Sequence, residues 1–355
     1  MYDNWLKFLK QHALSLTQYH SLPQFSKDYV STCYAESLIQ GSTIKHQHIS
    51  YSTVTLYLQN AGIFKRPHPI LPSSTLQYPP LLQSILHEYK RWQSIPNRRH
   101  PVTLNMLDYL YKRQLHKHSD SYDCALYDWL VLGMHTGHRK SEWCQDTTEF
   151  RNSNSFSLSV QKTSTAFIAQ DFKLSYKPTP QESSPISPLQ PNYLEITWRF
   201  QKNGQNGQVV SFAHNYKHPH RSPVRAAERI LARARRLSHP DDHPLAIFKS
   251  ASFQNKNKPE SISYIFHSQV EKSLRILAAK VYSISSKSEL QKYSCHSLRV
   301  GACVLLHSSG AEALTIKFRL RWRSDSFMEY LRNTPKLAAM HTHVLSTTNT
   351  DDIIL

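Results

Sequence analysis

The stretch that decides the fold is His296–Thr334, which has the sequence HSLRVGACVLLHSSGAEALTIKFRLRWRSDSFMEYLRNT. Its first part predicts a helix over residues 296–308. His296 and Arg299 stand three residues apart, so they share one face of that helix. The N-terminus of a helix carries partial positive charge, and both side chains can therefore meet one phosphate there. Taken alone, this spacing of His and Arg is common by chance.

Two aromatic residues follow in the same stretch. Trp322 has an indole N–H that can donate a hydrogen bond to a phosphate oxygen. Tyr330 comes eight residues later and is the only tyrosine after Arg299, although the chain has 19 in all. Taken alone, Tyr330 is better explained as a packed aromatic residue on a C-terminal helix, with Phe327 three residues before it.

An arginine and an acidic residue stand together in an earlier segment, Thr136-Gly-His-Arg-Lys-Ser-Glu142. The glycine predicts a turn between two helical stretches that presents Arg139, and Glu142 lies three residues later on the same face. We expect His138 to face solvent or DNA. The alternative for this segment is an Arg–Glu pair that caps a helix.

A β-hairpin is predicted over Trp198–Phe212, because two Asn-Gly pairs supply the turn. Lys202 lies at the lip of this hairpin, where a lysine is ordinarily a solvated charge. Lys162 and Lys173 lie on neighbouring predicted strands and remain alternatives to Lys202 for any role that needs a lysine. Lys202 is favoured because only it stands beside a hairpin turn.

The composition bounds the class of protein. The 355 residues have 43 Lys and Arg against 25 acidic residues, a net charge of +18, and 39% hydrophobic residues. The chain can therefore bury real cores, and its charge points to nucleic acid rather than to an anionic membrane. The five cysteines are odd in number and form no C-x-x-C, which argues against a disulfide framework and a structural zinc site. No stretch approaches the length of a membrane span.

The pattern predicts an α+β protein with more than one domain. Residues 1–98 read as a helical domain, with helices expected near residues 5–14, 50–63 and 79–92, and the basic connector at 95–101 marks a boundary. Residues 101–335 predict a mixed, mainly helical domain with a small antiparallel sheet, followed by a tail at 336–355. Helices are expected at 224–237, 261–279 and 311–318, among others, and strands at 156–160, 167–174 and 193–200.

The ordered set of Arg139, Lys202, His296-x-x-Arg299, Trp322 and Tyr330 resembles the tyrosine recombinase, or phage integrase, family. The match is closest over His296–Thr334, where the sequence resembles the Crypton-type and DIRS-type recombinases of eukaryotic mobile elements. The segment 221–229 also resembles that group. The resemblance covers residues 100–335, and the N-terminal helices match only in type, as a core-binding domain that clamps DNA.

The resemblance implies a role for each residue. Arg139 and Arg299 would clamp the phosphate of a DNA backbone with forked donors. Tyr330 would be the nucleophile that forms a 3′-phosphotyrosyl bond, and Lys202 the general acid for the leaving 5′ oxygen. His296 would assist proton transfer. Two further residues complete the set: Trp322 would contact the transition state, and Glu142 would support the geometry.

The implied enzyme breaks and rejoins DNA without metal, cofactor or ATP, and no carboxylate cluster with metal-ligand spacing is visible in the sequence. One departure from the family is the spacing from Trp322 to Tyr330, which is eight residues where bacterial members usually leave nine. The partners implied are double-stranded DNA and three further copies of the chain, a homo-tetramer on two DNA sites. The tail at 336–355 is expected to dock on a neighbouring protomer.

Five basic residues are candidates for contact with the DNA backbone. They are Arg98, Arg99, Lys217, Arg221 and Arg225. Without a secretory signal, the chain is expected in a reducing, DNA-containing compartment, the nucleus or an organelle such as a plastid. Two rival functions stay open. One is a type IB topoisomerase that relaxes supercoils, and the other is an inactive recombinase that only binds DNA.

Overall fold

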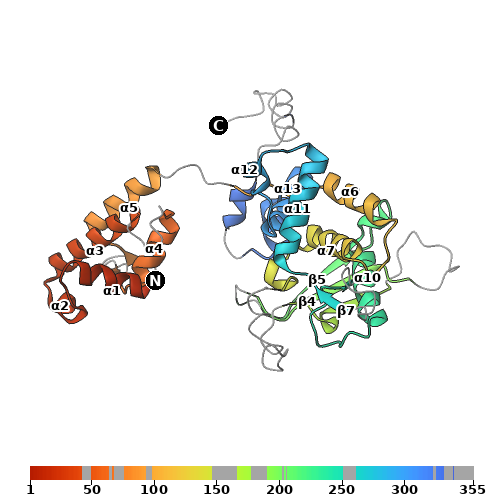
Figure 1. Ribbon diagram of the computed structural model, residues 1–355, viewed down its shortest axis with the longest axis horizontal. Coiled ribbons are helices and arrows are strands. Elements are labelled where there is room, and N and C mark those ends of the chain that lie inside the picture. The colour runs from red at the N-terminus through yellow and green to blue at the C-terminus, as the bar shows by residue number, and fades with distance from the viewer. Residues whose placement is uncertain are drawn as a thin grey trace, which may run out of the picture. The chain divides into compact units, whose positions relative to one another are not determined.

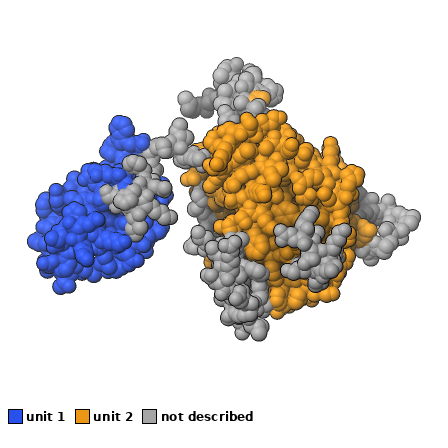
Figure 2. Space-filling view, in the orientation of Figure 1, with its two compact units in different colours: residues 1–97 blue, residues 98–355 orange. Residues whose placement is uncertain are grey.

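The computed structural model divides the chain into two compact units, residues 1–97 and residues 98–355 (Figure 2). The described residues are 1–41, 49–63, 66–67, 76–92, 98–145, 166–176, 190–201, 204, 206–250, 261–322, 325–331 and 339.

The first unit is helical. Its helices are α1 (Tyr2–Gln11), α2 (Leu16–Ser21), α3 (Gln24–Ile39), α4 (Tyr51–Asn60) and α5 (Pro80–Trp92), and a two-residue ladder joins β1 (Arg66–Pro67) to β2 (Leu76–Gln77). Helix α3 has no counterpart among the expected helices. Its buried face includes Ser31 and Thr32 beside Tyr34 and Leu38, so apolar periodicity does not mark it.

Aromatic residues form the core of the first unit. Trp5 and Tyr34 are fully buried, with ring centroids 4.8 Å apart, and Phe8 packs against both. The Tyr34 hydroxyl donates to Asn4 Oδ1 at 2.9 Å, which gives the buried hydroxyl its partner. This core joins α1 to α3, and every residue of it belongs to the first unit.

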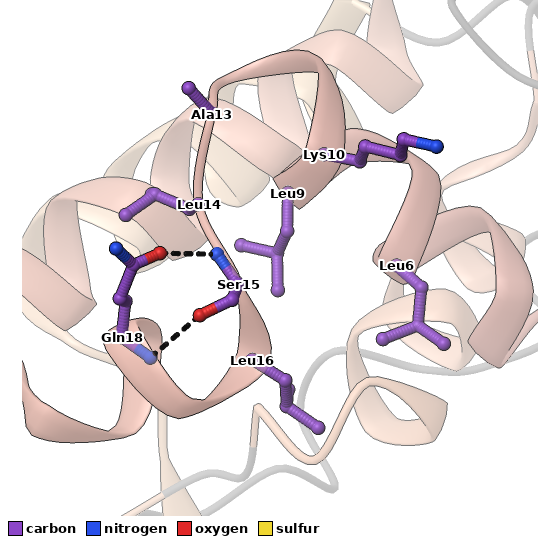
Figure 3. A pocket seen from close by; sticks show the side chains of 8 residues that line it. All are labelled: Leu6, Leu9, Lys10, Ala13, Leu14, Ser15, Leu16 and Gln18. Carbon is purple, nitrogen blue, oxygen red and sulfur yellow. Dashed lines mark hydrogen bonds between the residues drawn. The ribbon is translucent and has the colours of Figure 1, made fainter.

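An open hollow of about 460 Å³ lies where α1 turns into α2 (Figure 3). Ser15 begins α2 with a capping box, because its hydroxyl accepts from the Gln18 amide and Gln18 Oε1 accepts from the Ser15 amide. The hollow is mostly apolar. Its lining consists of Leu6, Leu9, Lys10, Ala13, Leu14, Ser15, Leu16 and Gln18.

The second unit is built around one buried helix, α7 (Tyr122–Thr136), which lies among its neighbours in Figure 1. Nearly every residue of α7 is buried, because other helices pack against it on several sides. These are α6 (Leu104–Gln114), α10 (Pro223–Arg236) and α13 (His296–Ser308). Helices α11 (His267–Tyr282), α12 (Lys287–Leu290) and α14 (Ala313–Arg319) complete the set among the described residues.

A three-stranded antiparallel sheet covers part of this helical core. Its order is β3 (Phe172–Ser175), β4 (Tyr193–Trp198) and β5 (Gln208–Ala213). Alternate residues of β4 are buried, as a sheet with one face on the core requires. The predicted hairpin is confirmed, since β4 and β5 pair with Trp198 opposite Gln208. The glycines of the turn, Gly204 and Gly207, adopt φ of +75° and +78°.

Two predicted elements are corrected. The strand expected at 167–174 begins only at Phe172, because residues 169–171 form a 3₁₀ turn in which the Asp171 carboxylate accepts from the Ile168 amide. The helix expected at 261–279 begins at His267. Residues 261–264 instead form β7 (Ser261–Tyr264), which pairs with β6 (Ile247–Ser250). The strand expected at 156–160 lies outside the described residues.

The protein is therefore mainly helical with small antiparallel sheets, an α+β fold. None of the helices in the described ranges combines the length and the apolar character that a membrane crossing needs.

Candidate active site around Tyr330

Helix α13 begins at His296, as the sequence predicted, and carries both His296 and Arg299. It packs closely against α7 and against the chain at Val102. The Val102 amide donates to the Ser297 carbonyl at 2.9 Å, and Gly301 lies so near that a Cβ there would stand 2.3 Å from the Val102 carbonyl oxygen. This close packing determines where His296 and Arg299 stand relative to the C-terminal end of α7.

Tyr330 ends a 3₁₀ helix, η4 (Asp325–Tyr330). Phe327 is fully buried in a small apolar cluster with Cys303 and Leu320, and this cluster fixes η4 against α13 and α14. The Tyr330 hydroxyl lies 3.0 Å from His296 Nε2. The two residues, 34 positions apart in the chain, are thus brought into hydrogen-bond contact.

Arg299 lies next to this pair, with 2% of its surface exposed. Its guanidinium donates to the carbonyl oxygens of Gly137 and Leu320. It also stacks over the Trp322 ring, with 4.0 Å from its central carbon to the ring centroid. Trp322 in turn lies 5.4 Å from the Tyr330 ring between centroids, so these residues form one cluster.

Glu142 connects Arg139, from the turn after α7, to the rest of the site. Its carboxylate accepts from the Arg139 amide at 2.9 Å and from the Arg139 guanidinium at 3.0 Å. It also accepts from Arg321 at 3.0 Å and from the Trp198 indole at 3.3 Å. Glu142 is buried, and four donors therefore surround it.

Arg321 is a residue of this site that the sequence analysis missed. It is 2% exposed, and its guanidinium stacks 3.6 Å from the Trp198 ring centroid. Its backbone adopts φ of +57°, a left-handed conformation that non-glycine residues rarely adopt. The only signal in the sequence was its position next to Trp322. A lone arginine between Leu320 and Trp322 follows no recognisable pattern.

Positive charge exceeds negative charge in this cluster. The guanidiniums of Arg139, Arg299 and Arg321 gather around one carboxylate, that of Glu142. Burial lowers the pKa of Arg299, and the charges of Arg139 and Arg321 lower it further. Burial also lowers the pKa of Arg321; the charge of Glu142 offsets part of this shift, and Arg139 adds to it. Such a site is stabilised by an anion placed among the three guanidiniums.

The two groups that face each other, His296 and Tyr330, are both held toward their neutral forms. Desolvation, then the charges of Arg299 and Arg99, lower the pKa of His296. Desolvation, then the charge of Glu329, raise the pKa of Tyr330, against which Arg299 acts. A neutral imidazole beside a neutral phenol can accept the phenolic proton.

The Trp322 indole N–H is buried and has no acceptor among the described residues. A buried donor without a partner costs free energy. An oxygen atom of an anion bound beside Arg299 can supply the missing acceptor, because Arg299 already lies over the same ring.

The lysine expected at the site, Lys202, lies outside the described residues, and so does Lys162. Lys202 follows Trp198 by four residues in the sequence, and the Trp198 indole donates to Glu142. Lys173 is described and lies on β3 opposite Glu195, with which it forms an ion pair at 3.4 Å. Glu195 and Trp198 face opposite sides of β4, so Lys173 lies on the side of the sheet away from Glu142.

The expectation for His138 is wrong. Its side chain is 1% exposed and packs 5.4 Å from the Trp143 ring between centroids, while His138 Nδ1 contacts Thr136 Oγ1 at 2.9 Å. Gly137 caps α7 in a left-handed conformation, and the chain turns inward at His138 before Arg139 faces the cluster. Burial therefore lowers the pKa of His138 well below its usual range.

The candidate DNA contacts differ in their surroundings. Arg98 and Lys217 are exposed, and Arg99 is exposed but donates to the Gln291 carbonyl at 2.7 Å. Arg221 forms a bidentate ion pair with Asp108, and Arg225 pairs with Glu228 at 2.6 Å. The last two are thus engaged within the second unit.

Within the described part of the chain, no three His, Cys, Asp or Glu side chains lie close enough to hold a metal ion. The tail at 336–355 lies outside the described residues apart from residue 339.

No protein-family model and no curated protein matches the sequence. Several solved structures are similar to this chain. The Tn1549 transposon integrase, in complex with transposon right-end DNA, is 16% identical over 97% of this chain and 92% of that chain, with a TM-score of 0.47. The XerH site-specific recombinase on a palindromic difH substrate is 12% identical over 90% and 70%, with a TM-score of 0.48. The XerA recombinase is 16% identical over 98% of each chain, with a TM-score of 0.39.

Proposed function

We propose that this protein is a site-specific DNA recombinase that breaks and rejoins DNA through a covalent bond between Tyr330 and a DNA phosphate. The observation that carries the proposal is the contact of the Tyr330 hydroxyl with His296 Nε2 at 3.0 Å, beside the buried guanidinium of Arg299. A nucleophile, a proton acceptor and a cationic phosphate site are the parts that attack on a phosphodiester requires.

The guanidiniums would bind the scissile phosphate. Charge accumulates on the non-bridging oxygens of the phosphate in the transition state, and forked donors stabilise it. Arg139 is a quarter exposed and can reach a ligand from solvent. Arg299 stands beside Tyr330, and the Trp322 indole N–H is available as a third donor. The excess of positive charge at the site supports this role.

Bond formation would run from the Tyr330 oxygen to phosphorus. The phenolic proton passes to His296, whose lowered pKa keeps its imidazole neutral before the reaction. The bond from phosphorus to the 5′ oxygen breaks, and that oxygen takes a proton from a general acid. Attack by the freed 5′ hydroxyl of another strand reverses these steps and rejoins the DNA, so the energy of the phosphodiester is kept.

We assign the general acid to Lys202. The support is its position in the sequence, four residues after Trp198, whose indole donates to Glu142. Lys173 is paired with Glu195, which lies three residues, or about 10 Å, along β4 from Trp198.

A matched experiment compares Lys202→Ala with Lys173→Ala on DNA whose 5′ bridging oxygen is replaced by sulfur. A thiolate leaves without help from an acid, so this substrate should restore cleavage by Lys202→Ala. Lys173→Ala should cleave both the sulfur-containing and the ordinary DNA at the wild-type rate. Equal cleavage of ordinary DNA by Lys202→Ala and the wild type would reject the assignment.

The wider biological setting belongs to the same proposal. The enzyme would act in the integration or excision of a mobile element or plasmid, as a homo-tetramer on two DNA sites, in a nucleus or organelle. The first unit would clamp the duplex and the tail at 336–355 would join protomers. The net charge of +18 supports a polyanionic partner.

Covalent trapping tests the central step. The purified protein is mixed with nicked duplexes from the ends of the genetic element that encodes it, in EDTA, and then denatured. We expect a protein–DNA adduct that is absent in Tyr330→Phe, whereas Tyr216→Phe, an exposed tyrosine, forms it normally. Binding without any adduct would favour an inactive DNA-binding protein. An adduct that relaxes supercoils but never exchanges strands between two duplexes would favour a type IB topoisomerase.

A further inference from the structure

A hollow lined partly by basic residues lies in the second unit, along the N-terminal half of α7. Its volume is about 380 Å³, and it opens between the turn from α6 to α7 and helix α10. Its lining combines apolar and basic side chains. The apolar lining includes Leu115, Cys124 and Ala232, and the basic residues are Lys117, Arg229, Arg233 and Arg236.

The acidic residues in and beside this hollow are paired with arginines, and Asp120 accepts from Arg236 at 2.6 Å. Both carboxylate oxygens of Asp128 are occupied, one by Arg229 and one by Arg233, each at 2.6 Å. Glu228 accepts from Arg225 at 2.6 Å, an arginine outside the lining. Five basic side chains (Lys117, Arg225, Arg229, Arg233 and Arg236) thus face three carboxylates (Asp120, Asp128 and Glu228), and positive charge remains in surplus at Lys117 and the arginines of Asp128.

Two guanidinium nitrogens in this lining lack a partner among the described residues, Nη1 of Arg233 and Nη2 of Arg229. Arg233 is 1% exposed, so no bulk water replaces the missing acceptor. A buried charged donor left without an acceptor costs free energy. An oxyanion in the hollow would supply acceptors in the forked arrangement that a guanidinium prefers.

We propose that this hollow binds a small organic anion, a phosphate or carboxylate attached to an apolar body. The oxyanion would lie at Lys117, Arg229 and Arg233, and the apolar body would cover Leu115 and Ala232. The site is distinct from the Tyr330 cluster, because Asp128 precedes Gly137 by nine residues of helix, about 14 Å along α7. The proposal does not depend on the proposed recombinase activity.

Calorimetric titration of the full chain with phenyl phosphate tests the proposal. The titration is made in an Arg139→Gln background, which weakens phosphate binding at the Tyr330 cluster. We expect binding, tighter than that of inorganic phosphate because the ring covers apolar surface. Lys117→Gln should weaken it about tenfold or more, as loss of a charge-assisted hydrogen bond predicts. Ala232→Leu fills the hollow without changing charge and should weaken phenyl phosphate more than inorganic phosphate.

The matched control is Lys272→Gln, an exposed lysine of α11 that does not line the hollow. Equal affinity in all variants, or no binding by the Arg139→Gln protein, would overturn the proposal. A duplex-binding measurement separates the two sources of such an anion. If Lys117→Gln weakens duplex binding more than Lys272→Gln does, the anion is a phosphate of the DNA backbone and the small-ligand proposal fails.

Discussion

Glu142 shows how much of this site depends on one buried carboxylate. It joins Arg139, from the turn after α7, to Arg321, from the end of α14, and to Trp198 on the sheet. Arg321 adopts a left-handed backbone that costs about 1–2 kcal/mol in a non-glycine residue. We interpret the Arg321 side chain as a positioning group that compensates for this cost by fixing Glu142.

Replacement of Arg321 by glycine tests this interpretation. The change relieves the backbone cost but breaks a buried ion pair, so the free energy of unfolding should fall by about 1–4 kcal/mol. The rate of adduct formation should fall about tenfold, a loss of about 1.4 kcal/mol. Duplex affinity should change little, because Arg139 and Arg299 remain. Arg321→Lys, which keeps the charge, should recover part of the rate. An unchanged rate in Arg321→Gly would show that Glu142 holds its place without it.

His138 makes the stability of the second unit depend on pH. Its pKa in the folded protein is lowered well below the unfolded value of about 6.5. Below pH 6.5 the unfolded chain binds a proton that the folded chain does not, so stability is lost as pH falls. The slope is about 1.4 kcal/mol per pH unit for this one residue. Denaturant unfolding at pH 7.0, 6.0 and 5.0 should show a shallower slope in His138→Asn, which keeps a partner for Thr136. Parallel slopes would mean that His138 is protonated in the folded state.

At the scale of elements, the approach of α13 to its neighbours determines the site. Gly133 of α7 faces Leu298, where a Cβ would stand 2.2 Å from Leu298 Cδ2, and Gly301 of α13 faces Val102. Both glycines allow helices to pack closer than any side chain would permit. The helix that carries His296 and Arg299 therefore lies close to the turn that carries Arg139.

Gly301→Ala should displace α13 and with it two residues of the site. The added methyl group meets the Val102 carbonyl oxygen at 2.3 Å and Met134 Sδ at 3.1 Å, and such overpacking costs about 1–3 kcal/mol. Gly310→Ala is the control, because its φ of +84° strains the backbone while the space around it is open. We expect both variants to lose stability in thermal unfolding, but only Gly301→Ala to lose most of the adduct. Similar adduct yields from the two variants would show that adduct formation does not depend on the close packing of α13.

At the scale of the whole molecule, each unit has its own hydrophobic core. The core of the first unit uses residues from Trp5 to Leu86, and the main core of the second begins at Val102. No residue of one core belongs to the other. Each unit therefore has the buried apolar surface that independent folding requires.

Separate expression of residues 1–97 and residues 98–355 should give two folded proteins. Each should unfold in one cooperative transition. The full chain should show the two transitions at the same denaturant concentrations as the separate pieces. A fragment that remains unfolded by circular dichroism would show that its core needs the other unit.

The local features of this protein were accessible from the sequence. Apolar periodicity and the His-x-x-Arg spacing predicted α13 to the residue, and the Asn-Gly pairs predicted the β4–β5 hairpin, because both signals depend on neighbours in the chain. The strand at 261–264 was mistaken for helix, since its pairing with β6 is not a local property. The order of the site residues in the chain led us to expect that they gather in one cluster. It did not predict which of them touch, such as Tyr330 and His296.

Only the tertiary structure determined which other residues join the site, which are buried, and how the charges balance. Arg321 became part of the site because the chain turns back after α14 and brings it to Glu142, 179 positions away. His138 became a core residue because Gly137 turns the chain inward. The surplus of guanidiniums arises only when separate segments converge, since charge balance at a site depends on distance in space and not along the chain.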